Sequence, residues 1–233
     1  MNILKRGDEW IFRLSTLALV AVIALVCMPT VAFADEVTMK LGQPTTPAPN
    51  GVYVDPYPIS VNGATTPSLL SCDDYATEIS VNFEWNANRY LLGDLNTAVS
   101  GTTPKFNATN WWGYSVQEMY DAAAVLTVDL LLNPANEALD SYALWTIFDP
   151  GPNPPDGAFT GSHALAATTL ANVHAGLLAA ELAYLNNHVY IYTPRAPDVS
   201  QEFIGYVPDG GMTLMLLGSA LVGLETMRRR FRA

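Results

Sequence analysis

Apolar and polar positions follow two different periods along this chain, and the two periods occupy separate regions. In residues 78–85 every second side chain is apolar, which predicts a half-buried strand with these side chains inward: Ile79, Val81, Phe83 and Trp85. Residues 69–72 and 189–192 have the composition of further strands. Helical spacing fills the region between, about residues 114–187. Segregated periods argue against a parallel βαβ sheet and predict an α+β domain, a β-rich part with a helical insertion.

Three helices are expected in the insertion. Ser115 can cap the first, and Glu118 three residues later completes a capping box. Apolar residues then follow helical spacing up to Asn133-Pro134. The second helix is expected over residues 136–148 and the third over residues 163–187, separated by a Pro/Gly-rich loop.

The segment before the first strand is rich in Pro, Thr and Gly. Residues 52–54 and 59–61 have strand composition, and Asn62-Gly63 is a strong turn signal, so an extended leader with an edge hairpin is expected. We therefore divide the chain into five parts: a signal peptide (1–34), the leader and hairpin (35–66), the α+β domain (67–193), a spacer (194–206) and a C-terminal signal (207–233).

The N-terminal segment has the three regions of a secretory signal peptide. A basic start precedes the apolar residues 14–28, and Pro29 ends the apolar run. Ala32 and Ala34 supply the small residues that signal peptidase requires, so cleavage is expected before Asp35. The chain is therefore expected to be exported.

The C-terminal segment also has three parts. It begins with a turn-forming motif, Val207-Pro208-Asp209-Gly210-Gly211, and ends with a basic cluster that includes Arg228, Arg229 and Arg230. Between them, residues 212–224 carry no charge, but a membrane span needs about 20 apolar residues. The apolar residues 203–207 could extend this segment, and the arginines would stay on the cytoplasmic side.

This tail resembles the PEP-CTERM sorting signals of exosortase substrates, in the variant that begins with VPDGG or VPDSG. The resemblance covers residues 207–233. It implies export, membrane anchoring through the C-terminal helix, processing by exosortase and release to the cell surface or extracellular matrix. The alternative for this segment is a plain C-terminal membrane anchor, because a membrane helix followed by arginines is common in membrane proteins.

The composition limits the partners of the exported part. Of the 22 Asp and Glu, four lie in the terminal segments, which leaves 18 acids in residues 35–207 against four bases: Lys40, Arg89, Lys105 and Arg195. Such a surface repels nucleic acid and anionic headgroups. Of the two cysteines, Cys27 leaves with the signal peptide, so Cys72 has no partner for an internal disulfide. Cys72 is a candidate reactive thiol, with burial as a small hydrophobe the favoured alternative.

A second resemblance covers residues 52–149 and rests on a series of short motifs: Val52-Tyr53-Val54-Asp55-Pro56-Tyr57, Cys72-Asp73-Asp74-Tyr75, Trp85, Tyr120-Asp121-Ala122-Ala123 and Tyr142-Ala143-Leu144-Trp145 followed by Phe148-Asp149. These are similar to a group of PEP-CTERM surface proteins and, more faintly, to the thioester domains of Gram-positive adhesins. Those domains pair a cysteine with a glutamine in a T-Q-x-A-I-W motif. Alignment on Ala143-Leu144-Trp145 puts Ser141 at the glutamine position, so no thioester is expected unless Gln117 substitutes in a different fold.

Other candidate sites are weak. Asp73 and Asp74 are adjacent, so in a strand their side chains would point to opposite faces. A Ca²⁺ loop at Asp149, Asn153 and Asp156 matches no EF-hand spacing. His163 and His174 lie three helical turns apart, too far to share a metal ion, and His188 adds no ligand pattern. Trp111, Trp112 and Tyr114 could stack on sugars.

We expect no catalytic residues, cofactor or metal. The expected function is that of a non-enzymatic surface or matrix protein in biofilm or adhesion. Its partners are signal peptidase, exosortase, the membrane before processing and exopolysaccharide, with no nucleic acid. The alternatives are a covalent thioester-type adhesin and a hydrolase of extracellular polysaccharide.

Overall fold

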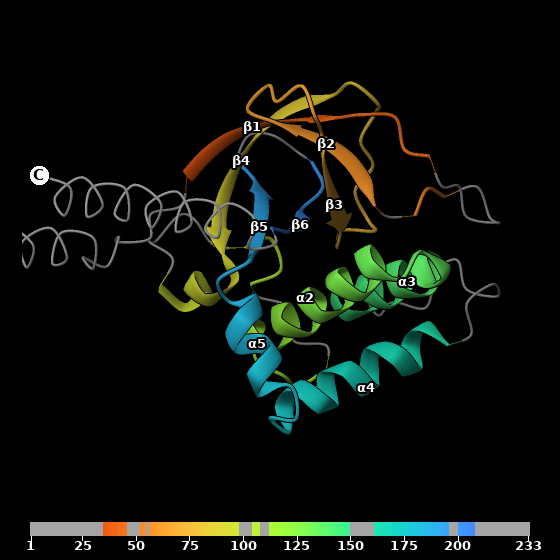
Figure 1. Cartoon of the computed structure of the whole chain (residues 1–233), viewed down its shortest axis with the longest axis vertical. Coiled ribbons are helices and arrows are strands. Elements are labelled where there is room, and N and C mark those ends of the chain that lie inside the picture. The colour runs from red at the N-terminus through yellow and green to blue at the C-terminus, as the bar shows by residue number, and fades with distance from the viewer. Residues whose placement is uncertain are drawn as a thin grey trace, which may run out of the picture. The chain divides into compact units, whose positions relative to one another are not determined.

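The β-rich part of the chain is a closed six-stranded antiparallel barrel with the strand order β1-β2-β3-β6-β5-β4 (Figure 1). The computed structural model describes residues 35–45, 52–54, 56–97, 104–107, 112–149, 161–195 and 200–207. The strands are β1 (Asp35–Leu41), β2 (Tyr57–Val61), β3 (Ser68–Cys72), β4 (Glu84–Leu91), β5 (Val189–Pro194) and β6 (Phe203–Tyr206). Pairing of β1 with β4, with Met39 opposite Trp85, closes the barrel.

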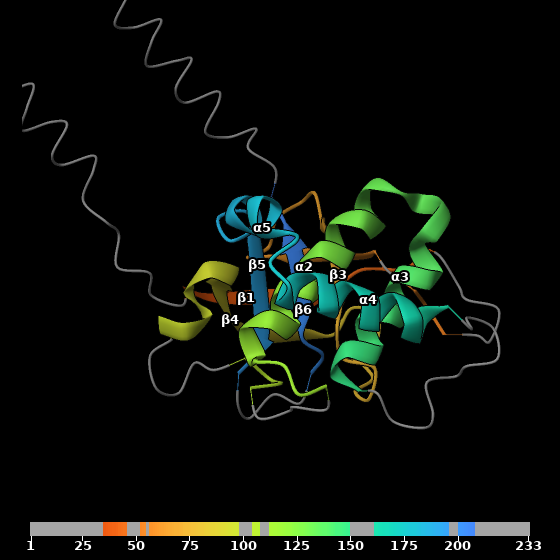
Figure 2. The ribbon, with the colours of Figure 1, turned by 90° about the horizontal axis from the view of Figure 1, so that it is seen from below.

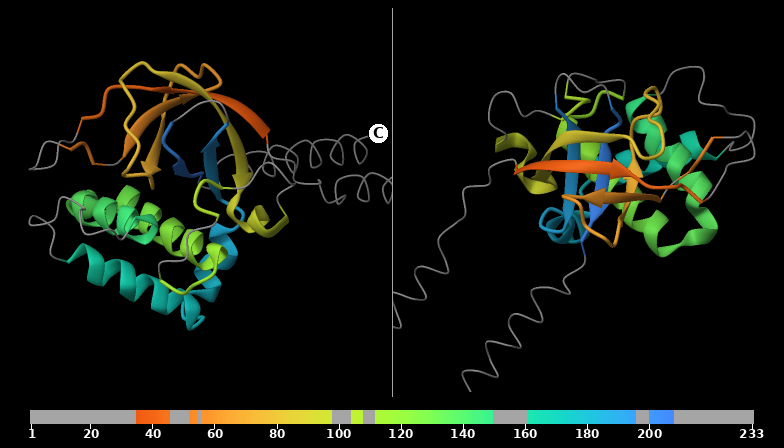
Figure 3. Two further views of the ribbon diagram at one scale, coloured as in Figure 1. Left: turned by 180° about the vertical axis from the view of Figure 1, so that it is seen from behind. Right: turned by 90° about the horizontal axis from the view of Figure 1, so that it is seen from above.

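Helices cover one side of the barrel. They are α2 (Val116–Leu132), α3 (Glu137–Phe148), α4 (Ser162–His174) and α5 (Ala179–Leu185), with two 3-10 helices, η1 (Leu92–Thr97) and η2 (Pro134–Asn136). Figure 2 looks onto these helices, and the view from above in Figure 3 looks onto β1 and β2 on the opposite side. The predicted α+β class is confirmed, with four strands before the helical insertion and two after it.

Three apolar clusters of buried residues occur in the described chain; the smallest consists of Val54, Tyr142 and Trp145, and the other two are larger. One fills the barrel, and its members come from all six strands; Met39, Ile59, Cys72 and Phe203 are among those with no exposed surface. The other lies between the barrel and the helices, where the apolar face of α2 packs against α3 and α4. The alternation in β1 explains the first core, because Val37, Met39 and Leu41 all point inward.

The N-terminus of α2 has the capping box that its sequence predicts. Ser115 accepts a hydrogen bond from the Glu118 N–H (3.2 Å), and the Ser115 N–H donates to Glu118 Oε2 (2.7 Å), so the capping box is confirmed. Both donors would otherwise lack a partner at the first turn of the helix.

The predicted leader and spacer contribute strands to the barrel. Because β1 and β2 pair with each other and with their neighbours, the segment 35–66 is part of the domain rather than an edge attached to it. Residues 203–207, expected as an apolar approach to the C-terminal helix, contain β6. Phe203 and Ile204 are fully buried between β3 and β5, so they cannot lengthen an apolar membrane segment.

Two predicted elements have different bounds. The strand expected at residues 78–85 begins only at Glu84; Val81 and Phe83 are exposed, because Asn82 has a positive φ of 66° and turns the chain. The single helix expected at residues 163–187 is broken into α4 and α5 at Gly176, whose φ is 70°.

Within the part of the chain that the structure describes, no single helix is long and apolar enough to cross a membrane. The helices α4 and α5 pass that test only as a pair, and they are bent by 95° at their break.

Candidate functional site

The end of β3 and the approach to β6 bring two chemically useful side chains together. These strands pair antiparallel with Cys72 opposite Phe203 and Ser71 opposite Ile204. Continued beyond Cys72, the same register brings Asp73 opposite Glu202 and Asp74 opposite Gln201. The segment from Cys72 to Asp74 therefore lies beside the segment from Ser200 to Glu202.

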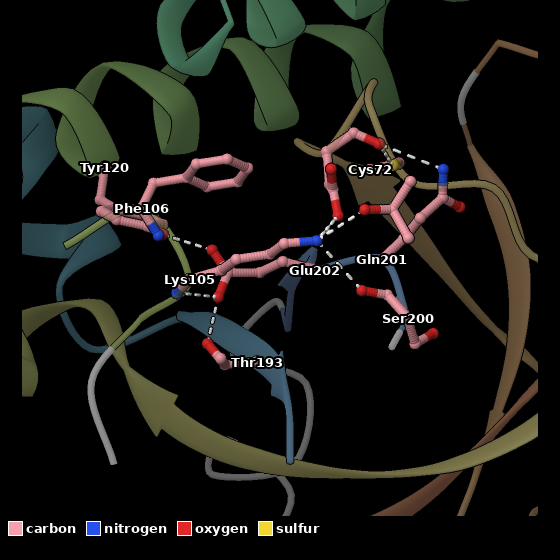
Figure 4. Close-up of polar contacts among 10 residues, drawn as sticks. Cys72, Lys105, Phe106, Tyr120, Thr193, Ser200, Gln201 and Glu202 are labelled. Carbon is pink, nitrogen blue, oxygen red and sulfur yellow. Dashed lines mark hydrogen bonds and ion pairs between the residues drawn. The ribbon is translucent and has the colours of Figure 1, made fainter. Parts of the chain in front are cut away.

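Cys72 and Gln201 share one hydrogen-bond acceptor, the backbone carbonyl of Asp74. The thiol donates to this oxygen over 3.4 Å, and the Gln201 carboxamide nitrogen donates to it over 3.1 Å (Figure 4). Because Cys72 Sγ and Gln201 Nε2 bond to the same oxygen, they cannot lie farther apart than these two donor–acceptor distances added together. The carboxamide carbon is one bond from that nitrogen, so thiol and acyl group lie within one small site.

The two side chains differ in exposure. Cys72 has no exposed surface and packs in the barrel core, and it forms no disulfide. Gln201 is partly exposed. Gln201 is therefore in partial contact with solvent, while the thiol is held inside the fold.

A buried polar network lies directly behind this pair. The Glu202 carboxylate, which has no exposed surface, accepts hydrogen bonds from the Tyr120 and Thr193 hydroxyls and from the Lys105 N–H at 2.8 Å (Figure 4). The Tyr90 hydroxyl donates to Thr193, which extends the network into β4. These bonds join α2, β5 and the segment 104–107 to the approach of β6.

Asp73 belongs to the same network and is fully buried. Its carboxyl contacts the Glu202 carboxyl and the backbone N–H of Asp73 itself, and no other side chain of the described residues donates to it. Two carboxyl groups can bond only when one carries a proton. Burial raises the pKa of Asp73 well above its ordinary value, and the negative charges of Glu202 and Asp74 raise it further. Burial also raises the pKa of Glu202, although its three donors oppose this, so we assign the shared proton to Asp73.

Asp74 has a different partner. Its carboxylate is 1% exposed and is paired with the Lys105 ammonium. The adjacent acids Asp73 and Asp74 thus have different partners, and each is part of a buried polar contact.

Ser141, which the alignment puts at the glutamine position, and Gln117, the possible substitute, both lie elsewhere. Ser141 is buried in α3, and its hydroxyl donates to the Glu137 carbonyl at 2.7 Å. Gln117, in α2, donates to the Leu92 carbonyl (3.2 Å) and to Asp121 Oδ1 (2.8 Å). The carboxamide beside the thiol is that of Gln201, which sequence alignment on Trp145 did not find.

The remaining candidates are dispersed. His163 packs on Trp112 with ring centroids 4.9 Å apart, His174 contacts Glu118 at 2.7 Å, and His188 stacks on Tyr184. The Trp112 indole N–H donates to the Thr146 and Ile147 carbonyls, which makes it a structural contact. No cluster suited to a metal ion occurs among the described residues.

Several predicted residues lie outside the described ranges. They are Trp111, Asn153 and Asp156, the signal-peptidase residues Ala32 and Ala34, and the sorting residues Pro208, Asp209, Gly210, Gly211, Arg228, Arg229 and Arg230. Of those two signals, the described ranges include only Asp35, the first residue of β1, and Val207, which follows β6.

The fold and the site define a small β-barrel with a helical cover and a cysteine–glutamine pair where β3 ends and β6 begins. Among solved structures, the chain is similar to an N-terminal thioester domain of a surface protein from Clostridium perfringens. The identity is 10%, the match covers 73% of this chain and 98% of that chain, and the TM-score is 0.38. No family model matches the chain, and no curated protein matches it. We therefore base the functional proposal on the residues of this chain.

Proposed function

We propose that this chain is an exported surface protein that attaches covalently to its target through a thioester between Cys72 and Gln201. The observation that carries the proposal is the shared acceptor: thiol and carboxamide both donate to the Asp74 carbonyl. Two reacting groups that are held about 3–3.5 Å apart in the correct orientation can gain about 7–11 kcal/mol over the bimolecular reaction, and the common acceptor keeps thiol and carboxamide in the same site.

The bond would form without a cofactor. The Cys72 sulfur attacks the Gln201 carboxamide carbon, the thiol proton passes to the departing nitrogen, and ammonia leaves. The product joins the end of β3 to the approach of β6. An amine of the target then attacks the same carbon, an amide forms, and the thiol of Cys72 is regenerated. The partial exposure of Gln201 supports this second step, because the amine must come from outside.

Export and anchoring remain proposals from the sequence. Cleavage before Asp35 would leave β1 at the N-terminus of the mature chain, and the segment from Val207 onward would direct sorting by exosortase. N-terminal sequencing of the exported form tests the first step. A tag placed after Ala233 should be lost in cells with exosortase and kept in cells without it, whereas retention in both would indicate a plain anchor.

The carboxyl pair of Asp73 and Glu202 does not support the hydrolase alternative. Asp73 and Glu202 are both fully buried, so a polysaccharide cannot reach them. Assay of the purified domain on extracellular polysaccharides tests this class independently.

The thioester is tested by intact mass. The wild-type mature chain is expected to have lost one ammonia, to resist alkylation at Cys72 after denaturation, and to gain methylamine at Gln201. The variants Cys72→Ala and Gln201→Ala should keep the full mass. The matched control is Gln117→Ala, which removes another partly buried, hydrogen-bonded carboxamide and should leave the ammonia loss intact.

Two results would contradict the proposal. A wild-type chain of full mass with an alkylatable Cys72 would return the protein to the class of non-covalent adhesion proteins. Ammonia loss that survives Gln201→Ala would place the bond at another glutamine. Ser141→Gln, which supplies the carboxamide expected from the sequence alignment, should not add a second ammonia loss.

A further inference from the structure

Lys105 belongs to a separate segment of the chain, and this segment contacts the site formed by Cys72 and Gln201. It lies in residues 104–107, and its backbone N–H donates to the buried Glu202 carboxylate at 2.8 Å. The next residue, Phe106, donates its N–H to the Tyr120 hydroxyl at 3.4 Å. These two bonds fix the backbone of Lys105 against the approach to β6 and against α2.

The Lys105 ammonium contacts both segments that carry the reacting groups. On the side of Cys72 it binds the Asp74 carboxylate and Thr77 Oγ1, the latter at 2.7 Å. On the side of Gln201 it donates to the Ser200 carbonyl at 3.2 Å (Figure 4). An ammonium has three donors, and these three acceptors satisfy all of them.

This ion pair differs from the other lysine and arginine pairs of the described chain. Lys40 with Glu84, Arg89 with Asp35 and Arg195 with Glu36 all join exposed or half-exposed side chains. Asp74, in contrast, is 1% exposed. A buried carboxylate whose cation is removed is left uncompensated, so the geometry at Asp74 depends on Lys105 in a way that the surface pairs do not.

Asp74 is also the residue whose carbonyl receives both the thiol and the carboxamide. We infer that Lys105 is the positioning residue of the proposed cross-link: by holding Asp74 and Ser200 together, it keeps Cys72 and Gln201 on their common acceptor. This inference rests on the proposed function. It assigns the role to the contact with Asp74 and Ser200, and Lys105 itself forms no bond to the reacting atoms.

We call the contacts of the Lys105 ammonium with Asp74 and Ser200 the Lys105 clamp. Loss of this clamp is expected to slow the formation of the thioester. A displacement of about 1 Å is enough to slow a reaction of positioned groups by about 100-fold. We therefore expect Lys105→Met to form the thioester at least about tenfold more slowly than wild type. Lys105→Arg keeps the cation and several donors, and should recover part of the rate.

The test uses the mature chain made by cell-free synthesis, quenched with acid at intervals and weighed intact. Two controls accompany it. Lys40→Met removes an equal charge from an exposed ion pair, and Ser115→Ala lowers stability at the start of α2 without touching the site. Both should lose ammonia at the wild-type rate, and circular dichroism should show all variants folded. A Lys105→Met chain that reacts at the wild-type rate would overturn the inference.

Two further experiments test the inference if Lys105→Met does not fold or if the wild type forms no thioester. If Lys105→Met does not fold, Thr77→Val removes one acceptor of the ammonium and should still slow the reaction, and an unchanged rate would overturn the clamp. If wild type forms no thioester, the proposed function fails. The clamp then predicts that Cys72 alkylates at least about tenfold faster in folded Lys105→Met than in wild type or Lys40→Met, because a thiol released from its acceptor opens more often to solvent. Equal rates would overturn it.

Discussion

Asp73 and Glu202 are two fully buried carboxyl groups that face each other across the continued register of β3 and β6. Glu202 accepts hydrogen bonds from Tyr120, Thr193 and Lys105, whereas the Asp73 carboxyl contacts the Glu202 carboxyl and its own backbone N–H. The pair is stable with one proton, and this makes the stability of the domain dependent on pH.

Asp73→Asn should therefore stabilise the domain increasingly as pH rises. A carboxyl whose folded pKa is raised does not affect stability below its unfolded pKa, near 3.8, and destabilises the fold as pH rises toward the folded pKa. Asparagine cannot ionise and can donate to Glu202. Between that point and the folded pKa of Asp73, the free energy of unfolding of the variant, relative to wild type, should grow by up to about 1.4 kcal/mol per pH unit. Urea titrations at several pH values measure this, and a difference that does not change with pH would contradict it.

Asp140 provides a second titration with a defined upper limit. It is 1% exposed in the first turn of α3, and its carboxyl oxygens have no hydrogen-bond partner among the described residues. Burial first, and the charge of Asp129 second, raise the pKa of Asp140 to about 7. Asp140→Asn should thus gain stability relative to wild type between pH 3.8 and about 7, by up to about 4 kcal/mol, and no more above that. A pKa of Asp140 near 4, measured by NMR, would refute this account.

The capping box of α2 can be tested at Ser115. Ser115→Ala should cost about 1 kcal/mol of stability, because the Glu118 N–H loses its acceptor. The hydrogen bonds from Ser115, followed by the contact with His174, lower the pKa of Glu118 to about 2, so the substitution should also raise that pKa. Thermal unfolding and an NMR titration of Glu118 give the two readouts. An unchanged Glu118 pKa would show that Ser115 does not hold this carboxylate.

Gly205 tests the packing between β3 and β5. A Cβ at this position in β6 would lie 2.5 Å from Leu70 Cδ2 and 3.1 Å from a Tyr192 ring carbon. Gly205→Ala should therefore destabilise the domain by about 1–3 kcal/mol through overpacking. Because Leu70→Ala vacates that space, the double variant should cost less than the sum of the two single variants, by at least about 0.5 kcal/mol. Additive costs would show that the barrel relaxes without the Leu70 side chain.

The local elements of the insertion were predictable because their signals are local. The Ser115–Glu118 capping box, the Asn133-Pro134 stop and the apolar spacing between them define α2 within about a residue. The break between α4 and α5 was missed, because a single glycine in a long Ala/Leu-rich run only lowers helix propensity. Its positive φ at Gly176 emerges from the tertiary fold.

The strands were harder to predict because their partners lie far away in the chain. The apolar alternation of β1 is present in its sequence, but it lies directly after the expected signal peptide, where an extended leader is the simpler prediction. Phe203 and Ile204 are apolar neighbours of the C-terminal segment, so the sequence favours an apolar approach to it, although they pair with β3 and β5. Apolar residues do alternate at residues 78–85, but the chain turns at Asn82, so β4 begins only at Glu84, where it pairs with β1.

The candidate site was missed for the same reason. Cys72 and Gln201 are brought together only by the pairing of β3 with β6, and no local pattern announces that pairing. The sequence does hold one signal. Ser200-Gln201-Glu202 directly precedes the apolar pair Phe203-Ile204, and Ser71-Cys72-Asp73 directly follows the apolar pair Leu69-Leu70. Antiparallel pairing of these two runs would have placed Gln201 near Cys72.

The position of Gln201 has a mechanical consequence. In the proposed attachment, the target is joined to the Gln201 side chain, and the chain leaves the barrel at Val207 after the four residues of β6. Tension between a bound target and the C-terminal segment would then run through the short stretch from Gln201 to Val207. The helices and five of the six strands lie outside this load path, so they would carry no tension, and their integrity would not determine whether the target stays attached.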